Sequence, residues 1–176
     1  MTERTSLVDF QREIFAQIEA FQQRGEERLC LRAESGKNNW AMDANDILHV
    51  AQMPKSLPFI PAAPAYVKGL LQQDGDVFTV FDLGHILSGT PTLLSKSNRV
   101  LILQPAMMAG VALLVEKAYS LISMESMHVH TKIVPIEYGS AVLGIETSET
   151  PWHWLDFETL LNSSAFATRR LDIQAK

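Results

Sequence analysis

The sequence predicts a mainly β fold with a helix near each end, and three observations lead to this prediction. About eight to ten short apolar runs follow one another at regular spacing, which is typical of barrels. Residues 67–73 and 76–82 flank an Asp-Gly pair, the usual signal of a two-residue hairpin loop. Four prolines between residues 54 and 64 exclude both a regular helix and a central strand in that stretch.

Residues 6–24 predict the N-terminal helix, and Gly25 supplies a natural stop. Its apolar residues recur at steps of three and four and form one stripe: Leu7, Phe10, Ile14, Ile18 and Phe21. The opposite face is polar and includes Arg12 and Gln23. A surface stripe normally packs on its own domain, but docking on a partner protein is the alternative, and the sequence leaves both open.

Residues 28–53 predict strands around a Gly-centred turn at residues 35–38. After the turn, apolar side chains return at five positions: Trp40, Met42, Ile47, Val50 and Met53. Cys30, the only cysteine, lies in the first of these strands, so the chain has no internal disulfide. We expect Cys30 to pack in that strand.

The hairpin of residues 67–82 carries apolar side chains on both faces of its strands, for example Leu71 and Phe81. A sheet with one wet face would alternate cleanly between apolar and polar residues. We therefore expect both faces to be covered, as where two barrels share a core. Gly69 fits a bulge or a close approach of backbone. The apolar residues between the prolines predict that this connection also packs on the body: Leu57, Phe59 and Ile60.

The second half of the chain continues the same pattern. After a polar loop at residues 88–98, residues 99–103 and 110–115 predict another hairpin. Residues 138–146 predict a further strand, and residues 156–161 predict a short closing helix.

Composition sets limits on function. Apolar residues make up 47% of the chain and charged residues 20%, which is ordinary for a globular domain. The formal charge of −5 and the lack of a basic stripe argue against general nucleic-acid binding. The N-terminus, "MTERTSLVDF", does not resemble a secretory signal. The apolar run at 100–115 is interrupted and is shorter than the roughly 20 residues of a membrane span. We therefore expect a cytoplasmic protein that does not insert into a membrane.

Motifs of common enzymes do not occur in the chain, including the nucleophile elbow, the phosphate-binding loop and the zinc-protease motif. The best metal candidate is His128 with His130, because alternate residues of a strand face the same way. No third ligand stands at a definable spacing, and the alternative is a pair of solvent-facing histidines. We expect no metal, no cofactor and no catalytic residue.

Trp152-His153-Trp154 also allows two interpretations: an aromatic clamp on a ligand, or two indoles that fill a core while His153 points outward. Core packing is favoured, because a pair of large aromatic residues mainly serves burial. A chain of this kind, without a reactive group of residues, is predicted to act by presenting surfaces to other proteins.

Residues 45–83, "NDILHVAQMPKSLPFIPAAPAYVKGLLQQDGDVFTVFDL", resemble the central signature of the CheW family, the coupling proteins of bacterial chemosensory arrays. The family pattern P-x-[FY]-[IV]-K-G matches residues 64–69. The matches in the following turn and strand are Gly75, Val77, Val80, Asp82 and Leu83. "RVLIL", "GVALLVEKAYSLISM" and "HWLDFETLL" are similar to later family segments, so the resemblance covers about residues 27–162.

This resemblance implies two small five-stranded SH3-like barrels packed together, with an N-terminal amphipathic helix and a short C-terminal helix. It divides the chain into a helical extension (1–26), a CheW-like domain (27–165) and a polar tail (166–176). Members of the family have no catalytic activity.

The resemblance also implies partners. One barrel would dock on the regulatory domain of a CheA-type histidine kinase, and the surface near the barrel junction would hold the cytoplasmic tip of a chemoreceptor in a membrane-bound array. The positions that match contacting segments of the family are Val50, Lys68, Gly69, Asp74, Gly75, Leu113 and Glu116. We expect Lys68→Glu to weaken partner binding without unfolding the protein.

The chain departs from the family at two of these segments. Asp74 stands where most members have arginine, and Gln52 stands where they have an acidic residue. The reversed charge favours a dedicated paralogue, and the long N-terminal helix resembles the type IV pilus (twitching motility) branch of PilI-like proteins. Two alternatives remain: a CheW-fold paralogue that modulates array assembly without receptor coupling, and a metal-dependent enzyme that uses His128 and His130.

Overall fold

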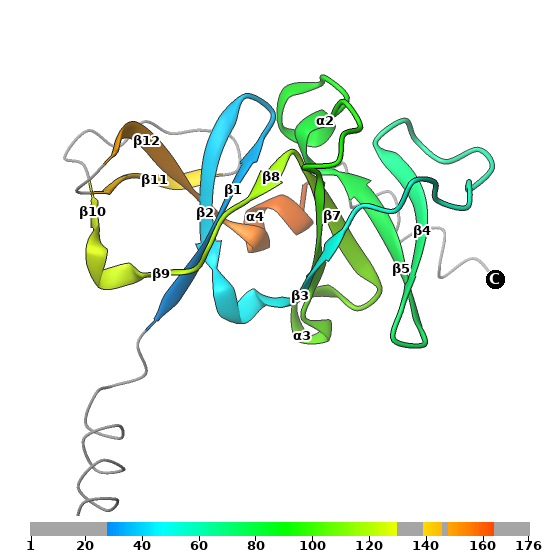
Figure 1. Cartoon of the computed structure of the whole chain (residues 1–176), viewed down its shortest axis with the longest axis horizontal. Helices are drawn as coiled ribbons and strands as arrows, with labels where there is room; N and C mark the ends of the chain where they lie inside the picture. The colour runs from blue at the N-terminus through cyan, green and yellow to red at the C-terminus, as the bar shows by residue number, and fades with distance from the viewer. Residues whose placement is uncertain (1–27, 130–138, 146–147, 164–176) are drawn as a thin grey trace, which may run out of the picture.

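The structure is a computed structural model that describes residues 28–129, 139–145 and 148–163. Two curled β-sheets lie side by side, and short helices and loops connect their strands (Figure 1). The predicted helix at 6–24, His130 and the polar tail at 166–176 lie outside the described residues.

The first sheet combines strands from both ends of the chain. Its strands are β1 (Leu29–Ser35), β2 (Asn38–Asp43), β8 (Lys117–Ala118), β9 (Ile122–Ser123), β10 (Met127–Val129), β11 (Gly139–Ile145) and β12 (Ser148–Leu155). The order is β10-β11-β12-β2-β1-β8, and β9 also pairs with β1. β12 runs parallel to β2, so the C-terminal strands complete the barrel that the N-terminal hairpin begins. The predicted turn at 35–38 is confirmed.

The second sheet comes from the middle of the chain. Its strands are β3 (Ile47–Gln52), β4 (Val67–Gln73), β5 (Asp76–Asp82), β6 (Arg99–Leu103) and β7 (Val111–Val115), in the order β3-β6-β7-β5-β4. Both predicted hairpins are confirmed: β4 pairs with β5 and β6 pairs with β7, each antiparallel. At the tip of the first, Asp74 and Gly75 have φ angles of 53° and 92°, positive as a type I′ turn requires.

Short helices connect the strands. They are η1 (Ala44–Asp46), α2 (Leu83–Ser88), α3 (Pro105–Met108), η2 (Met124–Ser126) and α4 (Phe157–Leu161). Asp156 caps α4 by accepting a hydrogen bond from the backbone N–H of Thr159, which confirms the closing helix. α2 is absent from the sequence predictions, because six residues are too few to show a helical period.

The largest apolar cluster lies between the two sheets and belongs to both. From the first sheet and α4 it takes Leu31, Trp40, Met42, Leu155 and Leu160, and from the second Phe81, Leu101, Leu103, Leu113 and Val115. A second cluster, with Leu71, Phe78 and Val80, fills the barrel of the second sheet, and a third, with Cys30 and Trp152, fills that of the first. The adjacent β5 residues Val80 and Phe81 thus face different clusters. This arrangement confirms two SH3-like barrels that share a core.

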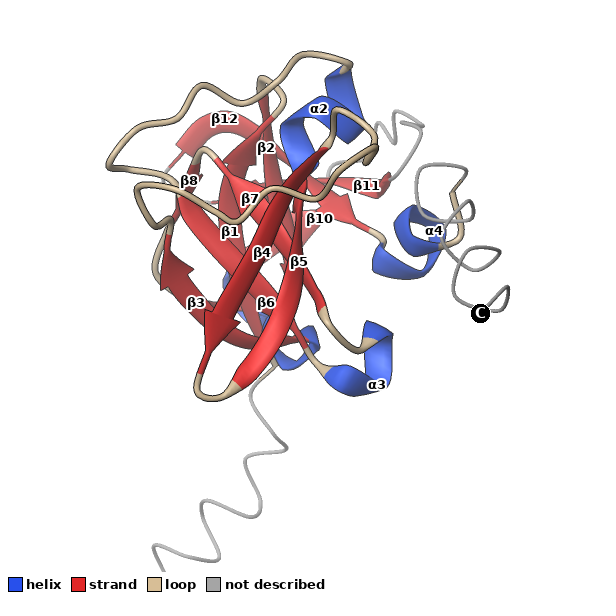
Figure 2. Ribbon diagram, turned by 90° about the vertical axis from the view of Figure 1, so that its right-hand side faces the viewer, coloured by secondary structure: helices blue, strands red, loops and turns tan. Residues whose placement is uncertain are grey.

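Gly69 shows both features that its sequence position predicts. It lies at a register shift between β4 and β5, and its φ of 140° is one that glycine tolerates best. A Cβ at this position would overlap the Pro58 carbonyl oxygen and lie 2.8 Å from Leu57 Cβ. The backbone N–H of Leu70 donates to the same Pro58 carbonyl at 3.0 Å, so the proline segment lies directly against β4 (Figure 2).

The apolar residues of the proline segment behave differently from one another. Leu57 packs on the cluster inside the second barrel, as predicted. Phe59 is 76% exposed, so the prediction that it packs on the body is wrong. Ile60 is partly buried.

Two further expectations are corrected. The described residues form twelve strands, more than the predicted eight to ten, because β8 and β9 are only two residues each. His153 does not point outward: its ring lies 5.7 Å from the Trp40 ring, and burial lowers the pKa of its imidazole. Trp152 is buried as predicted, with its indole in the core of the first barrel.

The apolar run at 100–115 forms β6, α3 and β7. Within the described part of the chain, no helix has the length and apolar character needed to span a membrane.

Candidate protein-docking surface

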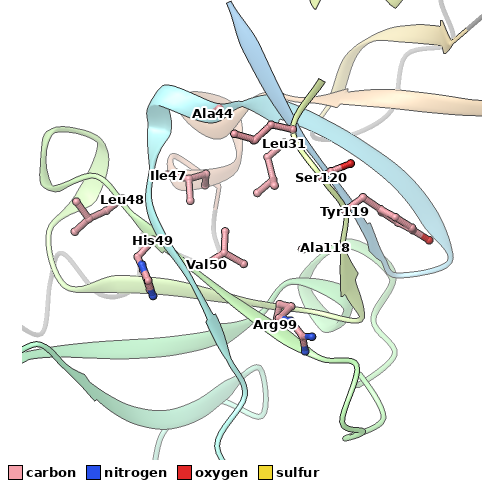
Figure 3. Close-up of a pocket in the computed structure, with 11 residues that line it drawn as sticks. Leu31, Ala44, Ile47, Leu48, His49, Val50, Arg99, Ala118, Tyr119 and Ser120 are labelled. Carbon is pink, nitrogen blue, oxygen red and sulfur yellow. The ribbon is translucent and has the colours of Figure 1, made fainter. Parts of the chain in front are cut away.

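A groove of about 430 Å³ opens at the junction of the two barrels (Figure 3). One wall is η1 and β3 of the second barrel, and the other is the segment from β8 to β9 of the first. We call it the junction groove, and its lining residues are Leu31, Ala44, Ile47, Leu48, His49, Val50, Arg99, Ala118, Tyr119, Ser120 and Leu121. Most of these side chains are apolar, while His49 and Arg99 supply basic groups.

Several large apolar side chains of the junction groove remain open to solvent. The exposed fractions are 50% for Leu48, 38% for Val50, 37% for Tyr119 and 50% for Leu121. Scattered exposed apolar residues are normal on a surface, but a contiguous group in a hollow marks a binding site. Val50, one of the residues singled out by sequence, lies inside this hollow.

β3 forms the edge of its sheet. Within the described residues it pairs with β6 on one side and with no strand on the other. Its burial pattern has only Ala51 fully covered, although Leu48 and Val50 are apolar. An uncovered edge strand with apolar side chains is a place where another segment of protein can bind.

The Tyr119 wall of the junction groove is held by charged neighbours. The Tyr119 hydroxyl donates a hydrogen bond to the Glu34 carboxylate, and Lys117 Nζ lies 3.2 Å from the same carboxylate. The hydrogen bond raises the pKa of Tyr119 and lowers that of Glu34. The Arg32 guanidinium lies 5.8 Å from the Tyr119 ring and 5.3 Å from the Trp152 ring. The wall is therefore fixed before any partner arrives.

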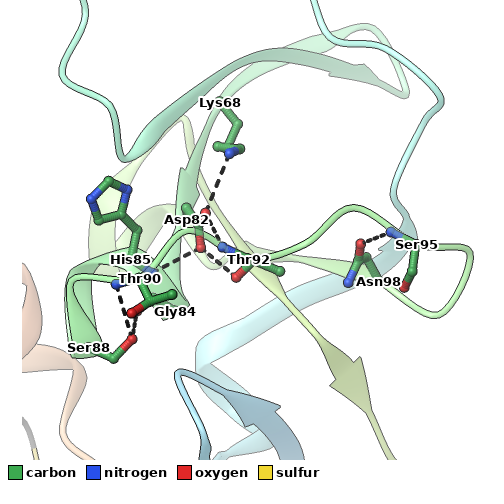
Figure 4. Close-up of polar contacts among 9 residues, drawn as sticks. All are labelled: Lys68, Asp82, Gly84, His85, Ser88, Thr90, Thr92, Ser95 and Asn98. Atoms are coloured by element: carbon green, nitrogen blue, oxygen red, sulfur yellow. Dashed lines mark hydrogen bonds and ion pairs between the residues drawn. The ribbon is translucent and has the colours of Figure 1, made fainter.

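Lys68 is tied to a buried carboxylate (Figure 4). Its Nζ lies 3.5 Å from Oδ2 of Asp82, which is fully buried, and the Lys68 side chain is only 21% exposed. Asp82 also accepts hydrogen bonds from the His85 backbone N–H at 3.1 Å, and from the Thr92 backbone N–H and hydroxyl at 2.9 and 2.6 Å. Lys68 thus helps to join β4, α2 and the loop that follows. Charge reversal there should therefore also lower the stability of the fold, and the expected effect of Lys68→Glu on partner binding stays a prediction.

The other residues that the sequence singled out occupy different places. Asp74 and Gly75 are exposed at the tip of the β4–β5 hairpin, outside the junction groove. Gly69 and Leu113 are buried, and Leu113 is a core residue with no exposed surface. Glu116 is half-buried and lines a second hollow of about 360 Å³ beside the loop after α2.

Sequence reasoning therefore found one residue of the junction groove, Val50, and missed its other exposed apolar members. Leu48 lies at a register shift between β3 and β6, so period-two alternation does not reveal its exposure. Tyr119 and Leu121 flank strands of two residues, which leave no period to detect.

The metal hypothesis falls largely outside the described residues. The backbone of His128 belongs to β10, while His130 is not described. Among the residues that are described, no three His, Cys, Asp or Glu side chains gather in a way that could hold a metal ion.

The comparison with protein families gives one match. The sequence model of the CheW-like domain matches residues 29–165, which is most of the chain. This chain belongs to the CheW-like domain family. The match begins at β1 and ends beyond α4, so it takes in both barrels of this CheW-like protein and the junction groove between them.

A solved structure agrees with the fold. The scaffolding protein TtCheW from Thermoanaerobacter tengcongensis aligns with a TM-score of 0.60 and 16% sequence identity, over 79% of this chain and 95% of that one. At this identity the likeness shows the shared fold. The comparison with curated protein sequences gave no match.

Proposed function

We propose that this CheW-like protein is a non-catalytic adaptor that couples a chemoreceptor to a CheA-type histidine kinase. The observation that carries the proposal is the exposed apolar junction groove, in a chain whose family includes a scaffolding protein. Such an adaptor needs no cofactor, and it would work in the cytoplasm beside membrane-bound receptor arrays.

The junction groove suits the helical tip of a chemoreceptor. An amphipathic helix can place apolar side chains against Leu48, Val50 and Leu121, which are partly desolvated already. His49 and Arg99 line the same groove and would attract acidic residues of the helix. The CheA-type kinase would then bind elsewhere, through its regulatory domain. The exposed hairpin tip at Asp74 and Gly75, and the surface around Glu116, are the candidates for that contact.

The pilus branch is part of the proposal. Asp74 is exposed at the hairpin tip, where the family that the sequence resembles has arginine, so a partner suited to arginine would meet the opposite charge. A dedicated kinase and receptor follow from this, and control of type IV pilus twitching motility is the output we propose.

A second candidate rests on the same residue. If the charge of Asp74 prevents the contacts that standard coupling proteins make with receptors, the protein would modulate array assembly without coupling a receptor. Co-purification with a chemoreceptor alone, and then with a CheA-type kinase alone, separates the two, because only the first candidate requires the protein to bind a receptor.

The first prediction tests the junction groove. Leu48→Glu should weaken binding of a purified receptor cytoplasmic fragment by at least about tenfold, because a charge would be buried against apolar groups in the complex. Isothermal titration calorimetry measures the dissociation constant. The matched control is Leu93→Glu, since Leu93 is 87% exposed and outside this groove. Equal affinities for the two variants would refute the groove as the receptor site.

A further inference from the structure

We infer that the apolar stripe of residues 6–24 docks in the junction groove of its own chain and covers it until a partner displaces the stripe. The inference has two parts. The docking itself rests on the groove and on the position where the described chain begins. Competition with a receptor rests in addition on the proposed function.

The first step is that the junction groove lacks a cover within the described residues. Leu48 and Leu121 are half exposed, and Val50 and Tyr119 are more than a third exposed. The hollow has a volume within the usual range for a binding pocket of roughly 300–1,000 Å³. Its open β3 edge and apolar lining fit an apolar segment of protein better than a polar small molecule.

The second step is that the chain enters the body beside this groove. The Arg28 guanidinium lies 2.8 Å from Oδ2 of Asp43, the residue before the groove-lining Ala44. The Arg28 carbonyl accepts a hydrogen bond from the Met124 backbone N–H at 2.8 Å, just past Leu121. Leu31, three residues further on, lines the groove itself. Residues before Arg28 therefore start from one end of the groove.

The third step concerns reach. A helix from Leu7 to Phe21 is about 21 Å long at 1.5 Å per residue. Residues 25–27 can span at most about 10 Å, and Gly25 allows the chain to reverse direction there. A tether this short gives an effective concentration on the order of millimolar for any surface within reach. The junction groove is within reach of this tether.

The fourth step concerns two adjacent apolar residues that are exposed outside the groove. Leu93 and Leu94 are 87% and 60% exposed. Both belong to the loop between α2 and β6. α2, from which this loop leaves, lies at the end of the molecule away from the start of β1 (Figure 1). The short tether from Arg28 favours the near surface, so the groove and the stripe are the pair that the chain brings together.

The consequence is a built-in competitor. A receptor helix would have to displace residues 6–24 before binding, so its apparent affinity falls by the fraction of molecules in which the groove is open. The same stripe would keep the apolar groove from promoting association between adaptors when no receptor is present.

The second prediction tests this docking in the full chain without any partner. Leu48→Cys places a thiol in the groove, while the native Cys30 is buried and serves as the background. Adding Ile14→Glu puts a charge in the stripe and should release it from the groove. A maleimide should then label the introduced groove thiol about ten times faster, because the groove is no longer covered. Gln23→Glu puts the same charge on the face opposite the stripe and should leave the labelling rate unchanged.

A second measurement guards against a local effect on folding. In the full chain with Ile14→Cys and Leu48→Cys, mild oxidation should form an intramolecular disulfide, seen by mass spectrometry of the digested monomer. Ile14→Cys with Asp74→Cys, at the hairpin tip, should form none.

Unchanged labelling in the Ile14→Glu variant would overturn the inference, and so would a disulfide found only between two chains, which would point to a second copy in the groove. Neither readout involves a receptor. Failure of receptor binding would therefore count against the proposed function and leave the docking result standing. If both hold, Ile14→Glu should also strengthen receptor binding.

Discussion

At the scale of single residues, the buried Asp82 explains why a charged pair sits inside a protein that is otherwise apolar in its centre. Asp82 caps α2 and fixes Thr92 in the following loop, and Lys68 balances its charge from β4. A buried carboxylate left without its partners costs several kcal/mol, whereas a fully partnered one holds its neighbours in a single arrangement. The polar pattern at these positions therefore serves the fold first.

The third prediction follows from this pair. Lys68→Glu should lower the free energy of unfolding by about 2 kcal/mol, because it places a second carboxylate beside the buried Asp82. The loss stays moderate because the side chain at position 68 is partly exposed to solvent. Urea denaturation followed by circular dichroism measures the change. Lys96→Glu, at an exposed lysine of the loop after α2, makes the same charge change and should cost about 0.5 kcal/mol or less. Equal losses in the two variants would contradict the role of the Asp82 pair.

At the scale of elements, the β4–β5 hairpin depends on two glycines for different reasons. Gly75 follows Asp74 at the exposed tip, where a Cβ would meet nothing within 4 Å and only the positive φ matters. Gly69 combines a positive φ with a site where the proline segment crosses the strand at backbone distance. The β4–β5 hairpin could form with a larger residue at position 69, but the proline segment could not then pack against β4.

The fourth prediction compares these glycines. Gly69→Ala should lower the free energy of unfolding by about 3 kcal/mol, because backbone strain adds to overlap with Pro58. Gly75→Ala should cost only about 1 kcal/mol, from strain alone. Thermal and urea unfolding of both variants give the difference. A loss for Gly69→Ala no larger than for Gly75→Ala would mean that the proline segment does not pack as described.

At the scale of the whole molecule, the two barrels share their largest apolar cluster. Leu113 belongs to the second barrel, yet it packs in a cluster that also contains Trp40 and Leu155 of the first. Neither barrel can bury its outward apolar face alone, so we expect them to fold and unfold together. This sharing also fixes the junction groove, since its two walls belong to different barrels.

The fifth prediction uses the tryptophans. All three lie in the first sheet, in β2 and β12. Leu113→Ala should lower the free energy of unfolding by about 3 kcal/mol and shift the tryptophan fluorescence transition together with the circular dichroism transition, although it changes the other barrel. Leu93→Ala, at an exposed site, should shift neither. A fluorescence transition that stays at its original midpoint would show that the barrels unfold independently.

Much of the fold could be predicted from sequence because its signals are local. The Asp-Gly tip, the glycine at the bulge and the two-faced apolar pattern of β5 depend on residues close together in the chain. The candidate site could be predicted only at Val50. The other exposed apolar residues of the groove come together only where β3 of one barrel lies beside the β8–β9 segment of the other: Leu48, Tyr119 and Leu121. No local sequence pattern predicts this contact between barrels.

The sequence by itself determined that this chain forms a β-hairpin with both faces buried, that a short helix follows the last predicted strand, and that the common enzyme motifs do not occur in it. Turn chemistry and burial periodicity act over a few residues, so they can be read from a single chain. The tertiary structure decided that Lys68 balances Asp82, that Leu113 is core, and that an apolar groove opens between the barrels. These features depend on contacts between residues that are distant in sequence. Such contacts form only when the strands assemble and the two barrels pack around their shared core.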